Sequence, residues 1–110
     1  MSYLGEFEQL ILFALLRLGD DAYGVAIREL IEERTGKAVS AGSIYTALGR
    51  LEERGLVRSR TEAAGQRRMG RPRKYYVLRR EGARALNESY ATIQSMAGGM
   101  ISKLTELVEE

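Results

Sequence analysis

The densest charge in this 110-residue sequence lies between residues 58 and 80. That stretch contains one acid, Glu62, and nine basic residues, which are Arg58, Arg60, Arg67, Arg68, Arg71, Arg73, Lys74, Arg79 and Arg80. Its formal charge is therefore +8, whereas the rest of the chain carries −6. A charge run is commonly just a solvated loop. Its concentration in an otherwise acidic chain instead favours a polyanionic partner, because such clusters neutralise the phosphates of nucleic acids.

A second candidate contact surface is one side of a helix predicted at residues 41–54, which Ser40 caps and Gly55 ends. Its buried side carries apolar residues at helical spacing: Ile44, Leu48 and Leu51. We place short or basic side chains on the opposite side: Ser43, Thr46, Ala47 and Arg50. Short side chains let a helix approach base edges, where a methyl group meets thymine and an arginine reaches guanine or a phosphate. The alternative is a merely solvated helix face.

The chain contains neither histidine nor cysteine, which excludes disulfides, thiolate or imidazole metal sites, and catalytic groups of these two types. None of its three lysines lies in a long apolar run of the kind that activates an amine. We therefore expect no enzymatic activity, no cofactor and no metal. The longest apolar run, Leu10–Leu16, is far shorter than the roughly 20 residues of a membrane span. Because Met1–Glu8 also lacks the basic start of a secretory signal, we expect a cytoplasmic protein that does not contact membranes.

Two further helices are predicted before residues 41–54. The first spans Gly5–Leu18 and is apolar nearly all round, so it must be buried on more than one side. The second begins with Asp20 or Asp21 as its N-cap and ends near Thr35, just before a glycine.

The periodicity changes after the third helix. Residues 56–61 and 74–78 are β-prone and are separated by a loop that contains glycines and a proline, which predicts a hairpin. In its second strand we expect Tyr76 and Leu78 to face inward. Three helices followed by a hairpin, or wing, is the element order of a winged helix-turn-helix, whose third helix enters the major groove of DNA.

From residue 80 to 110 the pattern is helical again, and apolar residues recur at spacings of four and three: Leu86, Tyr90, Ile93, Ala97, Met100, Leu104 and Leu107. This seam predicts a partner helix, because a helix roughly 40 Å long is too long for the preceding domain to cover. Ala97, Gly98 and Gly99 place three small residues in a row within this helix. They indicate a kink or a close approach of helices, or alternatively a cavity between subunits, lined by Tyr90, Met96 and Met100, where an inducer binds.

Five segments, in this order, resemble the PadR family of transcriptional regulators. They are Leu4-Gly5-Glu6-Phe7-Glu8, Asp21-Ala22-Tyr23-Gly24-Val25, Ser43-Ile44-Tyr45-Thr46-Ala47-Leu48, Arg50-Leu51-Glu52-Glu53-Arg54-Gly55-Leu56-Val57 and Gly70-Arg71-Pro72-Arg73-Lys74-Tyr75-Tyr76. Each is weakly specific alone, but their joint order is specific and extends over about the whole chain. The single C-terminal helix resembles the shorter subfamily.

The resemblance implies a homodimeric repressor that binds an inverted repeat through its third helix and wing, with the first and last helices at the dimer interface. It also places the tyrosines matching Tyr23 and Tyr45 at or near the DNA; the alternative is packing with an exposed hydroxyl. Two departures matter. Arg79 stands where the family usually has a helix-capping threonine, which leaves the start of the last helix open and offers a further phosphate contact. The chain has no tryptophan, so the drug binding of some members is not implied.

We therefore expect a mainly α chain with a small β-hairpin: a winged helix-turn-helix domain at residues 1–78 and a long C-terminal dimerisation helix at residues 79–110. We expect a sequence-specific repressor of double-stranded DNA; the alternative is a module that binds an acidic protein, or nucleic acid nonspecifically. The expected DNA contacts are Tyr23, Ser40, Ser43, Tyr45, Thr46, Ala47, Arg50, Arg67, Arg68, Arg71, Arg73 and Lys74. The expected homodimer interface is Leu10, Phe13, Leu16, Leu86, Tyr90, Ile93, Ala97, Met100, Leu104 and Leu107. The operator and the identity of any small-molecule inducer stay open.

Overall fold

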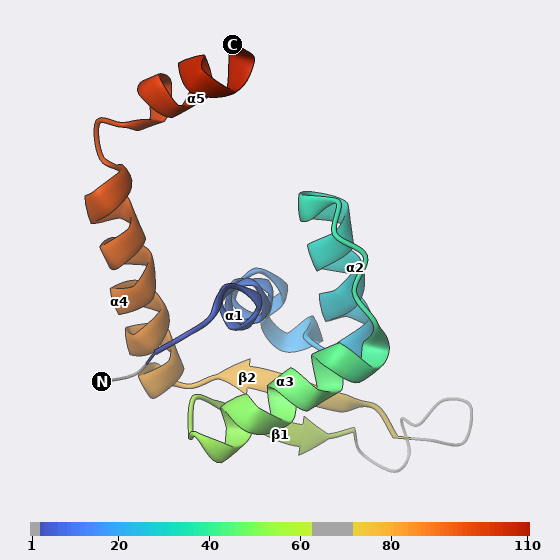
Figure 1. Ribbon diagram of the computed structural model, residues 1–110. Helices are drawn as coiled ribbons and strands as arrows, with labels where there is room; N and C mark the ends of the chain where they lie inside the picture. The colour runs from blue at the N-terminus through green and yellow to red at the C-terminus, as the bar shows by residue number, and fades with distance from the viewer. Residues whose placement is uncertain (1–2, 63–71) are drawn as a thin grey trace.

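The first helix lies at the centre of the molecule. The computed structural model describes residues 3–62 and 72–110, and in it α1 spans Glu6–Leu18 (Figure 1). The helix starts where the Glu8 carboxylate accepts the Gly5 backbone N–H at 3.0 Å. Its buried residues are Ile11, Leu12, Ala14 and Leu15. Because α2, α3, α4 and the hairpin all pack around α1, the prediction of a helix buried on more than one side is confirmed.

The second helix, α2, spans Gly24–Thr35 and begins later than predicted. Asp20 and Asp21 are not its N-cap: they belong to a short 3₁₀ turn, η1 (Gly19–Asp21), and the N-cap is Tyr23. The prediction was wrong because Tyr23 is held extended in a β-bridge with Tyr75, a long-range contact that local capping rules do not include.

The third helix, α3, spans Ala41–Glu53 and begins and ends as predicted. The Ser40 hydroxyl accepts the Ser43 backbone N–H at 3.0 Å. At the other end Gly55 adopts φ of +75°. There the Leu56 N–H donates to the Leu51 carbonyl at 3.0 Å and the Gly55 N–H donates to the Glu52 carbonyl at 2.9 Å, which is a Schellman motif. This sharp end turns the chain directly into the first strand.

The hairpin consists of β1 (Val57–Thr61) and β2 (Lys74–Leu78), paired antiparallel from Val57–Leu78 to Thr61–Lys74. Tyr76 is buried and Leu78 is half-buried, which agrees with the predicted inward face. The Tyr76 N–H donates to the Ala22 carbonyl at 2.8 Å, and this hydrogen bond joins β2 to the connection between α1 and α2. Residues 63–71, which include the predicted contacts Arg67, Arg68 and Arg71, lie outside the described residues.

The C-terminal region is two helices, not the single helix predicted. Helix α4 spans Arg80–Ala97 and α5 spans Ile101–Glu109. The break occurs because the Gly98 N–H still donates to the Gln94 carbonyl at 2.8 Å, whereas Gly99 adopts φ of +80°, which ends the helical path. The interpretation of the glycine pair as a kink is therefore confirmed. Figure 1 shows α4 leaving the body and α5 turned away from its axis.

This arm makes the chain extended for its size. The Cα radius of gyration is 16.3 Å, whereas a compact domain of this length has about 13 Å. Only the first turns of α4 are buried, at Gly82, Ala85 and Leu86, and α5 has no buried residue. The other buried core residues come from α1 to α3, from the hairpin, and from the segments beside them at Leu4, Ala22 and Leu56.

Two glycines provide a matched test of this packing. A Cβ on Gly82 would overlap the Leu56 carbonyl and the Leu78 side chain, whereas a Cβ on Gly49 would meet nothing within 4 Å. We predict that Gly82→Ala lowers the free energy of unfolding by about 1–3 kcal/mol through overpacking. Gly49→Ala should raise it by about 1 kcal/mol through helix propensity. Urea denaturation measures both, and equal stabilisation by the two substitutions would contradict the close contact of α4 with the hairpin.

Candidate nucleic-acid interface

The outward face of α3 is exposed and almost free of large side chains. Ser43, Thr46 and Arg50 are exposed on it, as predicted. Sequence reasoning missed two glycines on the same face, Gly42 and Gly49, which are also exposed. The available signal was energetic, because each glycine inside a helix costs about 1 kcal/mol relative to alanine. The result is a smooth surface that another molecule can approach to within contact of the backbone.

Ala47 does not belong to this face, contrary to the prediction. Its side chain is 8% exposed and is part of the hydrophobic core. Helical geometry explains the error: Ala47 is three residues beyond Ile44 and one before Leu48, so it lies on the buried flank of α3. It only borders the shallow groove that Ser40, Ser43, Thr46 and Arg50 line beside α1.

Tyr45 lies at the edge of the outward face, where α3 approaches the start of α2. Its side chain is 46% exposed. A Cβ on Gly24 would overlap the Tyr45 ring and hydroxyl, so the tyrosine packs directly against the glycine. The Tyr45 ring and hydroxyl therefore pack against the start of α2, and the rest of the side chain is exposed beside α3.

Two tyrosines and two arginines form a cluster at the base of the wing. The Tyr23 and Tyr75 rings meet edge to face, with centroids 5.7 Å apart. The Arg73 guanidinium lies 4.1 Å from the Tyr23 centroid and the Arg60 guanidinium lies 4.5 Å from the Tyr75 centroid. Cation–π contacts of this kind restrict arginines without neutralising them. Sequence reasoning identified Tyr23 and Arg73 but missed Arg60 and Tyr75, because the pairing depends on how η1 and the hairpin meet.

Charge in this cluster is preserved rather than cancelled. Arg73 donates a hydrogen bond to the Tyr75 hydroxyl at 3.5 Å, which raises the pKa of the guanidinium above its ordinary value. The carboxylate of Glu62 accepts the Arg73 backbone N–H at 3.0 Å, and the Glu62 N–H donates to the Arg73 carbonyl at 2.7 Å. The single acid of the basic stretch therefore closes the base of the hairpin through the backbone. Lys74 is exposed beside it.

A carboxylate links α3 to the wing. Glu52 accepts hydrogen bonds from the Ser59 N–H at 3.1 Å and from the Ser59 hydroxyl at 2.8 Å. Together with the Schellman end of α3, these bonds fix β1 relative to the outward face. Sequence reasoning did not identify the Glu52–Ser59 contact.

Arg79 also makes contacts within the chain. Its guanidinium donates to the Gly55 carbonyl at 3.3 Å and lies 3.7 Å from the Glu81 carboxylate.

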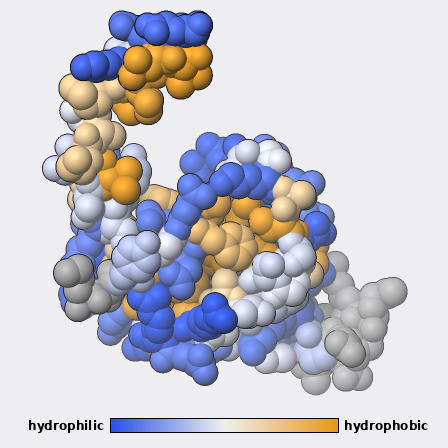
Figure 2. Space-filling view, in the orientation of Figure 1, coloured by the Kyte–Doolittle hydropathy of each residue, from blue (hydrophilic) through white to orange (hydrophobic). Residues whose placement is uncertain are grey.

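The predicted dimer-interface residues fall into two groups. Leu86 is buried in the core of its own chain, so it lies away from any exposed seam. Phe13 packs edge to face on Tyr90 of the same chain at 5.8 Å, and Leu10 is half-buried beside it. The other predicted residues are exposed except for the half-buried Ala97: Leu16, Tyr90, Ile93, Met100, Leu104 and Leu107. They lie along the exposed side of α1 and along the arm formed by α4 and α5. Figure 2 shows that the apolar side of α5 is turned toward the body of the chain and that its hydrophilic side is turned away.

Other kinds of site find no support in residues 3–62 and 72–110. No helix there combines the length and the apolar character needed to cross a bilayer. Acidic side chains in this part of the chain do not gather in threes close enough to hold a metal ion.

Comparison with known proteins gives one family. A sequence model of the PadR-like family of transcriptional regulators matches residues 12–88. A search of curated proteins found no match. Among solved structures, a PadR family transcription regulator from hypervirulent Clostridium difficile is 29% identical with a TM-score of 0.75, over 91% of this chain and 99% of that chain. A PadR family regulator from Eggerthella lenta is 32% identical with a TM-score of 0.68, over 92% and 87%. Bacillus subtilis PadR, solved in complex with operator DNA, is 26% identical with a TM-score of 0.62, over 74% and 46%.

The Glu52–Ser59 link is testable with a neighbouring control. We predict that Glu52→Ala lowers the free energy of unfolding by about 1–3 kcal/mol, because it leaves two partly buried donors on Ser59 without their acceptor. Glu53→Ala removes an exposed carboxylate one residue away and should change stability by less than about 0.5 kcal/mol. Urea denaturation provides both values. If the two variants were equally stable, the carboxylate would not hold the wing.

Proposed function

This chain belongs to the PadR-like family of transcriptional regulators, and on that premise we propose that it is a repressor that binds an inverted-repeat operator as a homodimer. DNA-binding transcriptional regulation is its general function. Operator binding is known here from the Bacillus subtilis PadR complex, and we extend it to this chain. Like its relatives, the chain acts as a regulator and not as an enzyme.

The observation that carries this proposal is the smooth outward face of α3 beside a cluster of restrained arginines. A helix enters the major groove only if its side chains do not hold it away from the bases, and Gly42, Ser43, Thr46 and Gly49 satisfy that condition. In this arrangement Ser43 and Thr46 contact base edges. Arg50, at the flank of the face, reaches a guanine or a phosphate.

The phosphate contacts come from the wing and the tyrosines. Arg73 and Lys74 lie at the base of the wing, and three further basic residues precede them in the sequence: Arg67, Arg68 and Arg71. Tyr23 is the N-cap of α2 and Tyr45 packs against Gly24, so both tyrosines lie beside the start of α2. Ser40 lies at the N-terminus of α3, where backbone N–H groups favour a phosphate. These groups position the protein without reading sequence, whereas the α3 side chains provide the selectivity.

A homodimer is supported by the exposed apolar arm. Helix α5 has nine residues and no buried side chain, and a helix that short is marginal in water without tertiary packing. Met96, Ile101, Leu104 and Val108 are between 57% and 80% exposed, and they continue the apolar surface of Tyr90 and Ile93. A second copy covers this surface, and two copies related by a twofold axis present two α3 helices to a symmetric operator.

Salt dependence tests the phosphate contacts. If each subunit neutralises five phosphates, the logarithm of the binding constant should fall with the logarithm of salt concentration at a slope of roughly −9 per dimer. We predict that Arg73→Gln makes the slope shallower by about 1.8, because each dimer loses two contacts. Arg84→Gln, an exposed arginine on α4, is the control and should leave the slope unchanged. Fluorescence titration of a labelled duplex at several salt concentrations gives the slopes, and a wild-type slope near zero would contradict DNA binding by the wing.

Loss of the dimer should weaken operator binding. We predict that Leu104→Asp gives monomers, because it places a charge in the apolar seam of α5, and that the affinity for a full operator falls by at least about 100-fold as the two half-site contacts become independent. Ser102→Asp lies on the opposite side of α5 and should remain dimeric. Light scattering measures the mass and a gel shift measures the affinity. A Leu104→Asp protein that kept the dimer mass would refute the proposed interface.

A further inference from the structure

Tyr75 lies at the centre of a row of side chains on the outer face of the hairpin. It pairs with Arg60 across the two strands, and on its other side it forms an isolated β-bridge with Tyr23. Residues directly opposite each other in antiparallel strands have side chains on the same face, roughly 5 Å apart at Cβ. Tyr23, Tyr75 and Arg60 therefore form one row. Arg73 precedes Tyr75 by two residues, so strand alternation places it on the same face.

Each tyrosine of this row supports one guanidinium group. The Arg60 guanidinium lies 4.5 Å from the Tyr75 centroid, and the Arg73 guanidinium lies 4.1 Å from the Tyr23 centroid. The two rings meet edge to face, and Arg73 also donates a hydrogen bond to the Tyr75 hydroxyl at 3.5 Å. Tyr75 therefore contacts Arg60 directly, and it contacts Arg73 both directly and through the Tyr23 ring.

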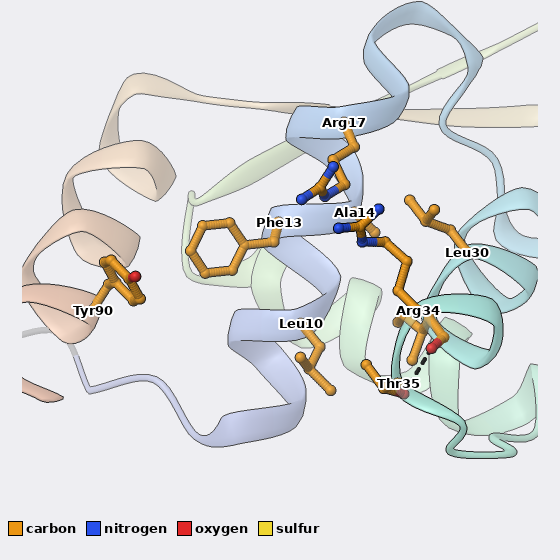
Figure 3. Close-up of a pocket in the computed structure, with 9 residues that line it drawn as sticks. Leu10, Phe13, Ala14, Arg17, Leu30, Arg34, Thr35 and Tyr90 are labelled. Carbon is orange, nitrogen blue, oxygen red and sulfur yellow. Dashed lines mark hydrogen bonds between the residues drawn. The ribbon is translucent and has the colours of Figure 1, made fainter. Parts of the chain in front are cut away.

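Stacking of cations on rings is confined to the hairpin within residues 3–62 and 72–110. The basic side chains that lie over a ring in those residues are Arg60, Arg73 and Lys74. Elsewhere, Arg17 and Arg34 line an apolar groove that also contains two aromatic side chains, Phe13 and Tyr90 (Figure 3). Neither guanidinium lies over either ring. Nearness to an aromatic residue is therefore not sufficient, and the strand pairing is what brings Arg60 onto Tyr75.

The charges of the two stacked arginines are not neutralised by an ion pair within the described residues. The ion pairs found there involve Lys37, Arg54 and Arg79. Arg60 is exposed, and its guanidinium donates to the Asp20 carbonyl at 3.2 Å, which fixes its direction without cancelling its charge. A guanidinium carries further N–H donors in the same plane, and such a planar set suits a phosphate.

This row is continuous with the outward face of α3. Tyr45, at the edge of that face, packs against Gly24. The residue before Gly24 is Tyr23, whose ring meets Tyr75. The row thus borders the surface that α3 offers to the major groove, where the phosphate backbone of a bound duplex lies.

We propose that Tyr75 is a positioning residue for phosphate binding, and that Arg60, which it holds, contacts a phosphate in addition to the wing residues already named. This inference rests on the DNA binding of the proposed function and specifies how two of its cations are held before the duplex arrives. An arginine that is already restricted loses less conformational entropy on binding than a mobile one. The arginines therefore set how many phosphates are neutralised, and the rings raise the affinity of each contact.

Salt titration separates these two roles, because the slope of the logarithm of the binding constant against that of salt concentration counts phosphate contacts. The probe is a fluorescein-labelled duplex of random sequence, which reports phosphate contacts without base reading. We expect Arg60→Gln to make the slope shallower by about 1.8, since each dimer loses two contacts. Tyr75→Leu should leave the slope within about 0.5 of wild type and lower the affinity at fixed salt by at least about tenfold. Arg34→Gln, the exposed arginine shown in Figure 3, is the control and should change neither.

A double-substitution cycle distinguishes positioning from a structural role of Tyr75. If the ring acts through the arginines, Tyr75→Leu should weaken binding less than about twofold in a chain that already carries Arg60→Gln with Arg73→Gln. A ring that only stabilised the hairpin would lower the affinity equally in both backgrounds, and that result would overturn the positioning role. Tyr75→Phe keeps the ring and both of its aromatic contacts, so it should bind within about threefold of wild type.

Arg60→Lys tests the same contact at an exposed position, without any change to Tyr75. Lysine keeps the charge but lacks the planar group that stacks on a ring and binds phosphate through two donors. The slope should therefore stay unchanged, while the affinity falls by at least about threefold. Wild-type affinity of both Arg60→Lys and Tyr75→Leu would refute the positioning role.

The remaining outcomes separate this inference from the proposed function. A slope that Arg60→Gln leaves unchanged, while the wild-type slope is steep, would refute the phosphate contact of Arg60 and leave DNA binding by the wing intact. A wild-type protein whose affinity for the duplex did not depend on salt would refute the proposed function as well.

Discussion

The junction between α3 and β1 is the constraint on which the contact surface depends. A duplex is recognised only if the helix in its groove and the basic hairpin on its backbone reach it together, so their relative position must be fixed before binding. The Schellman end at Gly55, burial of Leu51, Leu56 and Val57, and the Glu52–Ser59 hydrogen bonds fix it. At the other side, the Tyr76 N–H holds β2 to the Ala22 carbonyl. The wing base is thus attached at two points to the same body that carries α3.

The elements with strong local signals were predictable from the sequence. Ser40 caps α3 and Gly55 ends it because a hydroxyl acceptor and a positive φ act within one turn of the chain. The hairpin and the burial of Tyr76 follow from alternation along a five-residue strand. The face of α3 was predictable except for Ala47, which helical geometry alone would have placed on the buried flank, and except for Gly42 and Gly49, whose helix-propensity cost was the available signal.

The rest depends on contacts between distant residues. Asp20 and Asp21 are good capping residues, but the bridge from Tyr23 to Tyr75 moves the start of α2 beyond them. The Arg60–Tyr75 contact and the Glu52–Ser59 link join different elements, so no periodicity reports them. For Gly98 and Gly99 the sequence allowed both a continuous helix and a break, since spacing of the apolar residues at four and three continues across the glycines. The backbone conformation of Gly99 decides between them.

In the proposed function the two exposed surfaces have separate roles, with α3 and the wing facing the operator and the apolar arm facing a second copy. In vitro selection from random duplex DNA tests that division most directly, because the sequences retained by the full-length protein report both base reading and symmetry. We predict that the selected sequences share two half-sites related by a dyad, with centres about 10–10.5 base pairs apart or a multiple of that spacing. Selection of no common motif, or of a single motif without a dyad, would contradict sequence reading by a dimer.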